Sequence, residues 1–97
     1  MSKVNLTIVA SINPEGKVEL THYIEKVGEL YKRVNAIPIN KFKVTDSLIG
    51  NYIPSLVSIM EFPDMKSLTD VFESDEYKKL IPFREKAFSK LEAYISC

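Results

Sequence analysis

The stretch LVSIMEFPD, residues 56–64, contains the clearest structural signal in the chain. Its first seven residues are mostly apolar, and so short an apolar run predicts a strand over 56–62. Pro63 and Asp64 then open a helix, because aspartate is a preferred N-cap residue. The inner face of this helix is expected to consist of Leu68, Val71 and Phe72. A strand that leads directly into an amphipathic helix is typical of a domain that mixes α and β structure.

The residues upstream supply two more strands and a longer helix. Residues 4–12 are rich in β-branched side chains and predict the first strand, and residues 13–16 carry a turn signal. Alternation over 39–45 predicts the second strand. Between them, residues 17–34 predict an amphipathic helix that Pro38 prevents from continuing. Its apolar stripe consists of Leu20, Tyr23, Ile24, Val27, Leu30, Tyr31 and Val34.

The residues downstream complete the pattern. Ser74 is expected to cap a helical turn over 75–80, Pro82 to start a third short helical piece, and residues 91–95 to form the last strand. The resulting order, β-α-β-β-α-β, is that of a ferredoxin-like sandwich. Right-handed crossovers place the helices on one face of a four-stranded antiparallel sheet. We therefore expect residues 1–97 to form a single α+β domain.

Composition excludes several classes of function. The chain has 13 basic and 13 acidic residues, so its formal net charge is zero. Nucleic-acid binding requires a cationic field, and so does attraction to an anionic membrane surface, so we expect neither. No apolar run approaches the roughly 18 residues of a membrane span. Cys97 is the only cysteine, which excludes an internal disulfide and a cysteine-based zinc site. The cytoplasm is the expected location.

The two sides of the predicted strands differ in polarity. One side suits the floor beneath the helices: Val4, Leu6, Ile8, Phe42, Val44, Val57, Ile59, Leu91, Ala93 and Ile95. The other side is mixed: Asn5, Thr7, Val9, Lys41, Lys43, Thr45, Leu56, Ser58, Met60, Glu92 and Tyr94. Its apolar members expose too much surface for a sheet face in water. We therefore expect a homodimer, a dimeric α/β barrel of eight strands that can hold one small ligand. A monomer with an apolar sheet face is the alternative.

Polar side chains on this mixed side are the expected ligand contacts. They are Asn5, Thr7, Lys43, Ser58 and Tyr94, with Val9, Leu56 and Met60 as an apolar wall. Polar atoms that converge within an apolar wall are typical of a small-molecule pocket. A wet dimer interface, whose polar groups bond to one another or to water, is the alternative. Leu48 and Ile49, in the loop before the third strand, are expected to contact the other subunit, and a lid over the pocket is the alternative.

Three residues are candidates for proton transfer if the protein is an enzyme: His22, Glu61 and Tyr94. His22 is the only histidine and lies beside the inward-facing Tyr23, which places it at the surface of its helix. Glu61 ends a strand and could act as a base. Arg84 could instead hold Glu61 in a bidentate pair that fixes helix to sheet, which is the interpretation we favour.

Motifs for cofactors are missing from the sequence. It contains no P-loop and no G-x-G-x-x-G, H-E-x-x-H, G-x-S-x-G or EF-hand pattern. We therefore expect no nucleotide, flavin or metal. An enzyme of this kind would work by proton transfer or by activating an electron-rich substrate toward oxygen.

Residues 56–63, with FESDEY at 72–77 and LIPFR at 80–84, resemble a family of small bacterial proteins classed as a domain of unknown function. The family is part of the dimeric α/β barrel superfamily, which includes antibiotic-biosynthesis monooxygenases, muconolactone isomerases and some haem-degrading enzymes. The resemblance covers the last half of the chain well. Tyr23 matches a tyrosine common in the first helix, whereas Asn35-Ala36 stands where many relatives have a glycine pair.

The resemblance implies a face-to-face or swapped dimer with a cavity between sheet and helices, and it supplies no catalytic residue. We therefore expect a homodimer that binds a small, partly apolar organic molecule. One alternative is a cofactor-independent enzyme of the monooxygenase or isomerase type. Another is a module whose only role is association.

Overall fold

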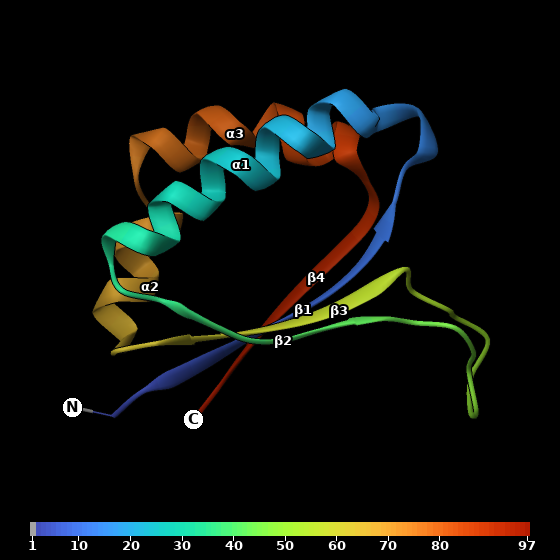
Figure 1. Cartoon of the computed structure of the whole chain (residues 1–97), viewed down its shortest axis with the longest axis horizontal. Coiled ribbons are helices and arrows are strands. Elements are labelled where there is room, and N and C mark those ends of the chain that lie inside the picture. Colours follow the sequence, from blue (N-terminus) through green and yellow to red (C-terminus); the bar gives the residue numbers. More distant parts are fainter. Residues whose placement is uncertain (1) are drawn as a thin grey trace.

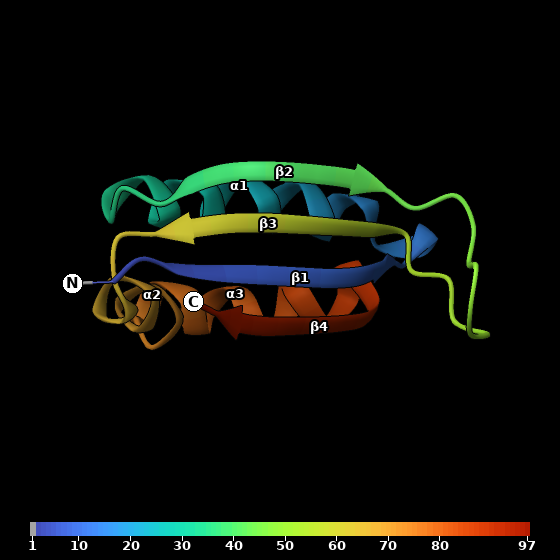
Figure 2. The same cartoon turned by 90° about the horizontal axis from the view of Figure 1, so that it is seen from below.

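The computed structural model describes residues 2–97 as one sheet of four strands with three α-helices. In chain order the elements are β1 (Val4–Ile12), the 3-10 turn η1 (Pro14–Gly16), α1 (Lys17–Arg33), β2 (Ile37–Lys43), β3 (Leu56–Phe62), α2 (Met65–Phe72), α3 (Asp75–Ala87) and β4 (Phe88–Ser96). The strands are antiparallel in the order β2-β3-β1-β4. The helices lie on one face of the sheet (Figure 1), and the other face is uncovered (Figure 2). The predicted ferredoxin-like β-α-β-β-α-β fold is confirmed.

The turn η1 before α1 and the end of α1 carry residues that suit their local geometry. The Asn13 side chain accepts a hydrogen bond from the Glu15 amide at 3.1 Å and donates one to the Lys86 carbonyl at 2.9 Å. Gly16 packs so closely against this carbonyl that a Cβ at Gly16 would lie 2.1 Å from the Lys86 oxygen. Beyond α1, Asn35 adopts a left-handed conformation with φ of 62°. It thereby ends the helix in the way that glycine usually does.

Side-chain caps start α2 and α3 as predicted. Asp64 accepts a hydrogen bond from the Ser67 amide at 2.7 Å, and Ser74 accepts one from the Tyr77 amide at 3.1 Å. The prediction that Pro82 starts a separate helical piece is wrong, because α3 continues through it. An internal proline costs a helix about 3 kcal/mol, and α3 offsets this cost by packing along α1 and burying its inner face. β4 accordingly begins at residue 88, earlier than predicted.

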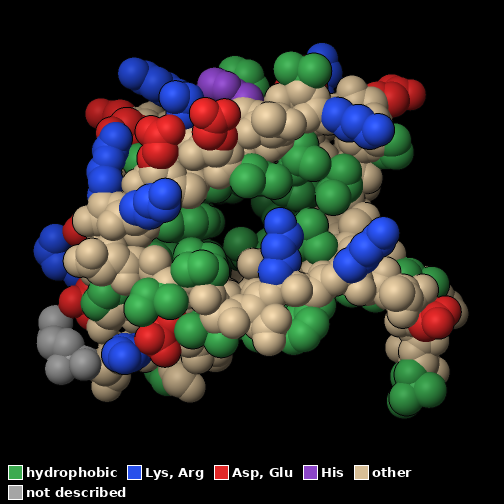
Figure 3. Space-filling model, viewed as in Figure 1, with side chains coloured by type: hydrophobic (Ala, Val, Ile, Leu, Met, Phe, Trp, Pro, Cys, Tyr) green, Lys and Arg blue, Asp and Glu red, His purple; other side chains and the backbone are tan. Residues whose placement is uncertain are grey.

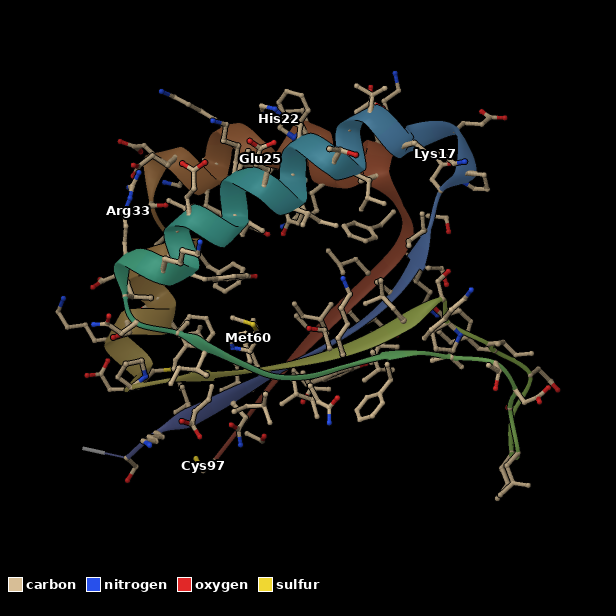
Figure 4. All side chains as sticks on the ribbon, in the orientation of Figure 1. Lys17, His22, Glu25, Arg33, Met60 and Cys97 are labelled. Carbon is tan, nitrogen blue, oxygen red and sulfur yellow. The ribbon has the colours of Figure 1, made fainter. Side chains whose placement is uncertain are left out.

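The register between β1 and β3 decides which side chains face the helices. Leu6 lies opposite Met60, and both side chains are buried on the helix side of the sheet; Figure 4 shows Met60 pointing toward α1. Thr7 lies opposite Ile59, and both point to the uncovered face, because side chains alternate along a strand. The prediction for β3, which placed Val57 and Ile59 beneath the helices, is therefore wrong.

The orientation predicted for β2 is wrong in the same way, since Phe42 lies opposite Val57 and Lys43 lies opposite Leu56. The orientations of β1 and β4 are as predicted. Alternation identifies which residues of a strand share a side, but only the pairing register tells which side that is. β3 is apolar on both sides, so its hydrophobic pattern could not choose between the two orientations.

Candidate ligand-binding cavity

A cavity of about 760 Å³ lies between the helix layer and the sheet. Residues of α1 and α3 form its roof, and residues of all four strands form its floor. Figure 3 shows it as a hollow bordered mainly by apolar side chains, with Lys and Arg side chains at its edge. Small-molecule sites typically measure about 300–1,000 Å³, so the volume suits a small organic ligand.

A continuous cluster of aromatic rings lines the cavity: Tyr31, Phe72, Tyr77, Tyr23 and Phe88. Neighbouring rings meet edge to face or tilted, with centroids 4.8 Å apart for Phe72 and Tyr77 and 5.8 Å apart for Tyr23 and Phe88. Such packing fixes ring orientations and contributes about 0.5–1.5 kcal/mol per pair beyond the burial of area. The aromatic wall is therefore stabilised by contacts within the protein itself.

Three polar groups stand within this wall. The Tyr23 and Tyr77 hydroxyls are 2.8 Å apart and share a buried hydrogen bond. Arg84 Nη1 donates a second hydrogen bond to the Tyr77 hydroxyl at 3.1 Å, and its guanidinium carbon lies 5.8 Å from the centre of the Tyr77 ring. The Tyr23–Tyr77–Arg84 cluster joins α1 to α3, and all three residues line the cavity.

Burial determines the charge state of this cluster. It raises the pKa of Tyr23 well above its ordinary value, as do the neighbouring Tyr77 and Tyr31. Burial also raises the pKa of Tyr31. For Arg84, burial lowers the pKa, but the hydrogen bond to Tyr77 and nearby groups raise it by more in total. Near neutral pH the cluster therefore combines a neutral Tyr23 hydroxyl with a permanent cation.

Gly28 lies in the middle of α1 and lines the cavity. A Cβ placed at this position would have no heavy atom within 4 Å, so close packing does not require the glycine. Glycine inside a helix costs about 0.5–1 kcal/mol relative to alanine. Gly28 therefore lowers the stability of α1, and the absence of a side chain at this position leaves part of the cavity open.

The five predicted polar contacts and Met60 of the predicted apolar wall are divided between the two faces of the sheet. Ser58 and Met60 line the cavity. Asn5, Thr7 and Tyr94 lie on the uncovered face, where Thr7 pairs with Tyr94 across the strands. Lys43 lies opposite Leu56 at the end of β2 and is exposed. The prediction that all six share one face is wrong, because β2 and β3 are turned over relative to it.

The three candidates for proton transfer also lie away from the cavity. His22 stacks on Phe83 with centroids 4.2 Å apart, and its side chain points away from the sheet (Figure 4). Glu61 faces the uncovered side and forms an ion pair with Lys3 at 3.4 Å, so its predicted pairing with Arg84 is wrong.

Tyr94 is the third candidate, and its side chain is exposed. Its hydroxyl donates a hydrogen bond to Glu92 at 3.0 Å. This bond raises the pKa of Tyr94. The hydroxyl is therefore held by a neighbour on the uncovered face.

Sequence reasoning missed the polar cluster, although part of it was visible. Tyr23 is in the apolar stripe of the first helix, and a buried tyrosine hydroxyl needs a hydrogen-bond partner. The sequence therefore indicates that Tyr23 needs a hydrogen-bond partner. It does not indicate that the partner is Tyr77, which is 54 positions away. Gly28, in the same helix, gave no signal, because its role depends on the empty space beside it.

Neither a cluster of metal ligands nor a membrane-spanning helix is found among residues 2–97. No three His, Cys, Asp or Glu side chains in this range come together as metal ligands. None of the helices described there has the length and apolar composition to cross a membrane.

A family model for a domain of unknown function, DUF1330, matches residues 7–95. The chain belongs to the DUF1330 family. The predicted resemblance is confirmed, and the match includes every residue of the polar cluster. No curated protein sequence matches this DUF1330 chain.

Solved structures share the fold of the DUF1330 chain at low sequence identity. A protein of unknown function from Rhodopseudomonas palustris superposes with a TM-score of 0.86 at 14% identity, over 97% of this chain and 80% of its own. A dimeric protein of unknown function with a ferredoxin-like fold, from Bacteroides fragilis, gives 0.61 at 9% identity, over 97% and 94%. SnoaB, a cofactor-independent oxygenase from Streptomyces nogalater, gives 0.68 at 8% identity, over 100% and 93%.

Proposed function

We propose that this DUF1330 protein is a homodimer that binds a small, partly apolar organic molecule in the cavity between its helices and its sheet. The observation that carries the proposal is a preformed cavity of about 760 Å³ that has an aromatic wall and a polar cluster set into it. Apolar walls give such sites affinity, and a few fixed polar atoms orient the ligand. The proposed site is on the helix side of the sheet.

The uncovered face of the sheet supports the homodimer. Val9, Val57 and Ile59 form its centre, and Phe42 and Tyr94 flank them with 48% and 53% of their surface exposed. An apolar sheet face of this kind marks an interaction surface. We assign it to a second copy, because a 97-residue chain gains stability by association and because the similar protein from Bacteroides fragilis is dimeric.

The loop between β2 and β3 supports the same assignment. Its tip extends beyond the end of the sheet (Figure 2) and carries Leu48 and Ile49, which are 97% and 91% exposed. The base of the loop is anchored, since Tyr52 and Ser11 share a hydrogen bond of 2.7 Å. Two adjacent aliphatic side chains on an anchored loop suit contact with the other subunit.

A cofactor-independent enzyme of the monooxygenase or isomerase type is the second candidate. The observation that favours it is the Tyr23–Tyr77–Arg84 cluster, which sets hydroxyl donors beside a cation in a partly water-excluded site. Such donors stabilise negative charge that develops during a reaction. Turnover of an electron-rich aromatic compound without added flavin or metal would support the enzyme, and saturable binding without turnover would support the binder.

Gly28 allows a direct test of the proposed site. Replacing Gly28 with Leu should fill the cavity without a backbone clash and should improve helix propensity. We expect the wild type to bind the apolar fluorescent probe N-phenyl-1-naphthylamine and the G28L variant to bind it at least tenfold more weakly. Thr21→Leu, on the exposed side of the same helix, is the matched control and should bind normally. Unchanged binding by a folded G28L variant would contradict this location for the site.

A further inference from the structure

The polar cluster contains more hydrogen-bond donors than acceptors. Its two tyrosine hydroxyls have two protons, and the bond between them uses one. Arg84 has five N–H groups, and within residues 2–97 its side-chain hydrogen bonding consists of the single bond to Tyr77. One hydroxyl proton and several guanidinium protons are therefore left for an acceptor that the protein does not supply.

The charged residues that line the cavity also favour a ligand that accepts hydrogen bonds, because most of them are basic. Three basic residues, Lys32, Lys41 and Arg84, line it together with one acidic residue, Glu85. Lys90 lines it too, but its Nζ lies 4.2 Å from the centre of the Tyr52 ring, which is outside the cavity. The whole chain has a net charge of zero, so this excess of cations is local.

The ion pairs lie elsewhere. Among residues 2–97 the pairs within 4.0 Å are Lys3–Glu61, Lys26–Glu29, Arg33–Glu76 and Lys66–Asp70. None of them includes a basic residue that lines the cavity. In the described chain no carboxylate thus lies within 4.0 Å of the Arg84 guanidinium, and Glu85 acts on its charge only from a longer distance.

We propose that the ligand is an organic carboxylate, with an apolar body against the aromatic wall and its carboxylate bound by Arg84 and the Tyr23–Tyr77 pair. The inference rests on the proposed function, since it names the chemical class that the same cavity takes. A carboxylate supplies two acceptor oxygens to the fork of an arginine, and such charge-assisted bonds are stronger than neutral ones. Lys32 and Lys41 attract the anion without contacting it directly.

The test compares two probes of almost the same shape. The carboxylate 2-naphthoate and its neutral amide 2-naphthamide differ in charge and in donor content, and calorimetry measures the affinity of the intact protein for each. We expect the wild type to bind naphthoate at least tenfold more tightly than naphthamide. Arg84→Gln should remove this preference while changing the naphthamide affinity by less than about twofold. Lys79→Gln removes one positive charge from α3 at a residue outside the cavity and should preserve the preference.

Each other outcome has a definite meaning. Equal affinity for the two probes in the wild type, or a preference that survives Arg84→Gln, would overturn the carboxylate assignment and leave the cavity as a site for neutral ligands. Binding of neither probe would overturn the proposed function as well. If Arg84→Gln fails to fold, the wild-type comparison still decides, supported by the double variant Lys32→Gln/Lys41→Gln. Those side chains are exposed, and their loss should weaken naphthoate binding several-fold and leave naphthamide binding unchanged.

Discussion

The two faces of the sheet are made by the same four strands but meet different surroundings. The helix side is covered and yet incompletely filled, so that buried residues such as Met60 adjoin an open cavity. The other side is apolar at its centre and has nothing over it in the single chain. The proposed ligand site and the proposed dimer interface therefore lie on opposite faces, and the adjacent residues Met60 and Ile59 each test one of them.

The largest effect is expected from Met60→Asp. Met60 is 7% exposed and belongs to the core, so a carboxylate there would be buried without a partner. We expect a loss of about 3–5 kcal/mol in the free energy of unfolding, which would unfold most domains of this size. Urea denaturation followed by circular dichroism measures the loss. A folded M60D protein of nearly wild-type stability would show that the register of β3 is wrong.

The substitution Ile59→Asp, one residue away, should act on association instead of folding. Ile59 is half-buried on the uncovered face, and in a face-to-face dimer its aspartate would be enclosed with a second copy of itself. We expect a folded monomer whose dimer dissociation constant is at least 100-fold higher, measured by sedimentation equilibrium. Thr21→Asp, on the exposed side of α1, should leave the dimer intact.

Two other results would contradict this face as the interface. One is a wild-type protein that is monomeric at high concentration, and the other is an I59D variant that dimerises as tightly as the wild type. The I59D monomer should also keep its affinity for N-phenyl-1-naphthylamine, because the proposed site is on the opposite face.

The difference between the two faces also explains which features could be predicted from the sequence and which could not. The order of strands and helices and the caps at Asp64 and Ser74 follow from local signals and were predicted correctly. The helix break predicted at Pro82 was wrong, because the packing of α3 against α1 is not a local signal. The orientation of β3 depends on its register with β1, and a strand with Val57 and Ile59 on one side and Met60 on the other has no local signal for it. The cavity was harder still, because it consists of space between distant elements. Ser58 does line the cavity, but it was predicted as a ligand contact on the opposite face of the sheet.

The smallest effect is expected from removing a single hydroxyl group, and it should differ between two tyrosines that lie on opposite sides of the sheet. Tyr23→Phe removes a buried hydroxyl that bonds to Tyr77, and it should cost about 1–2 kcal/mol in thermal unfolding. Tyr94→Phe removes an exposed hydroxyl and should leave the melting temperature unchanged. Equal effects of the two substitutions would contradict the placement of Tyr23 in a buried cluster.

The Tyr23 hydroxyl also predicts how stability depends on pH. Burial raises the pKa of Tyr23 above its unfolded value of 10.0, so the folded state keeps a proton that the unfolded chain releases. The stability from this group is present in full below pH 10 and is lost as the pH rises above it. In Tyr23→Phe the alkaline loss measured by urea denaturation should be shallower, and part of the remainder should come from Tyr31, whose pKa is raised by the same cause. An identical alkaline loss in the wild type and the variant would mean that Tyr23 ionises as freely in the folded protein as in the unfolded chain.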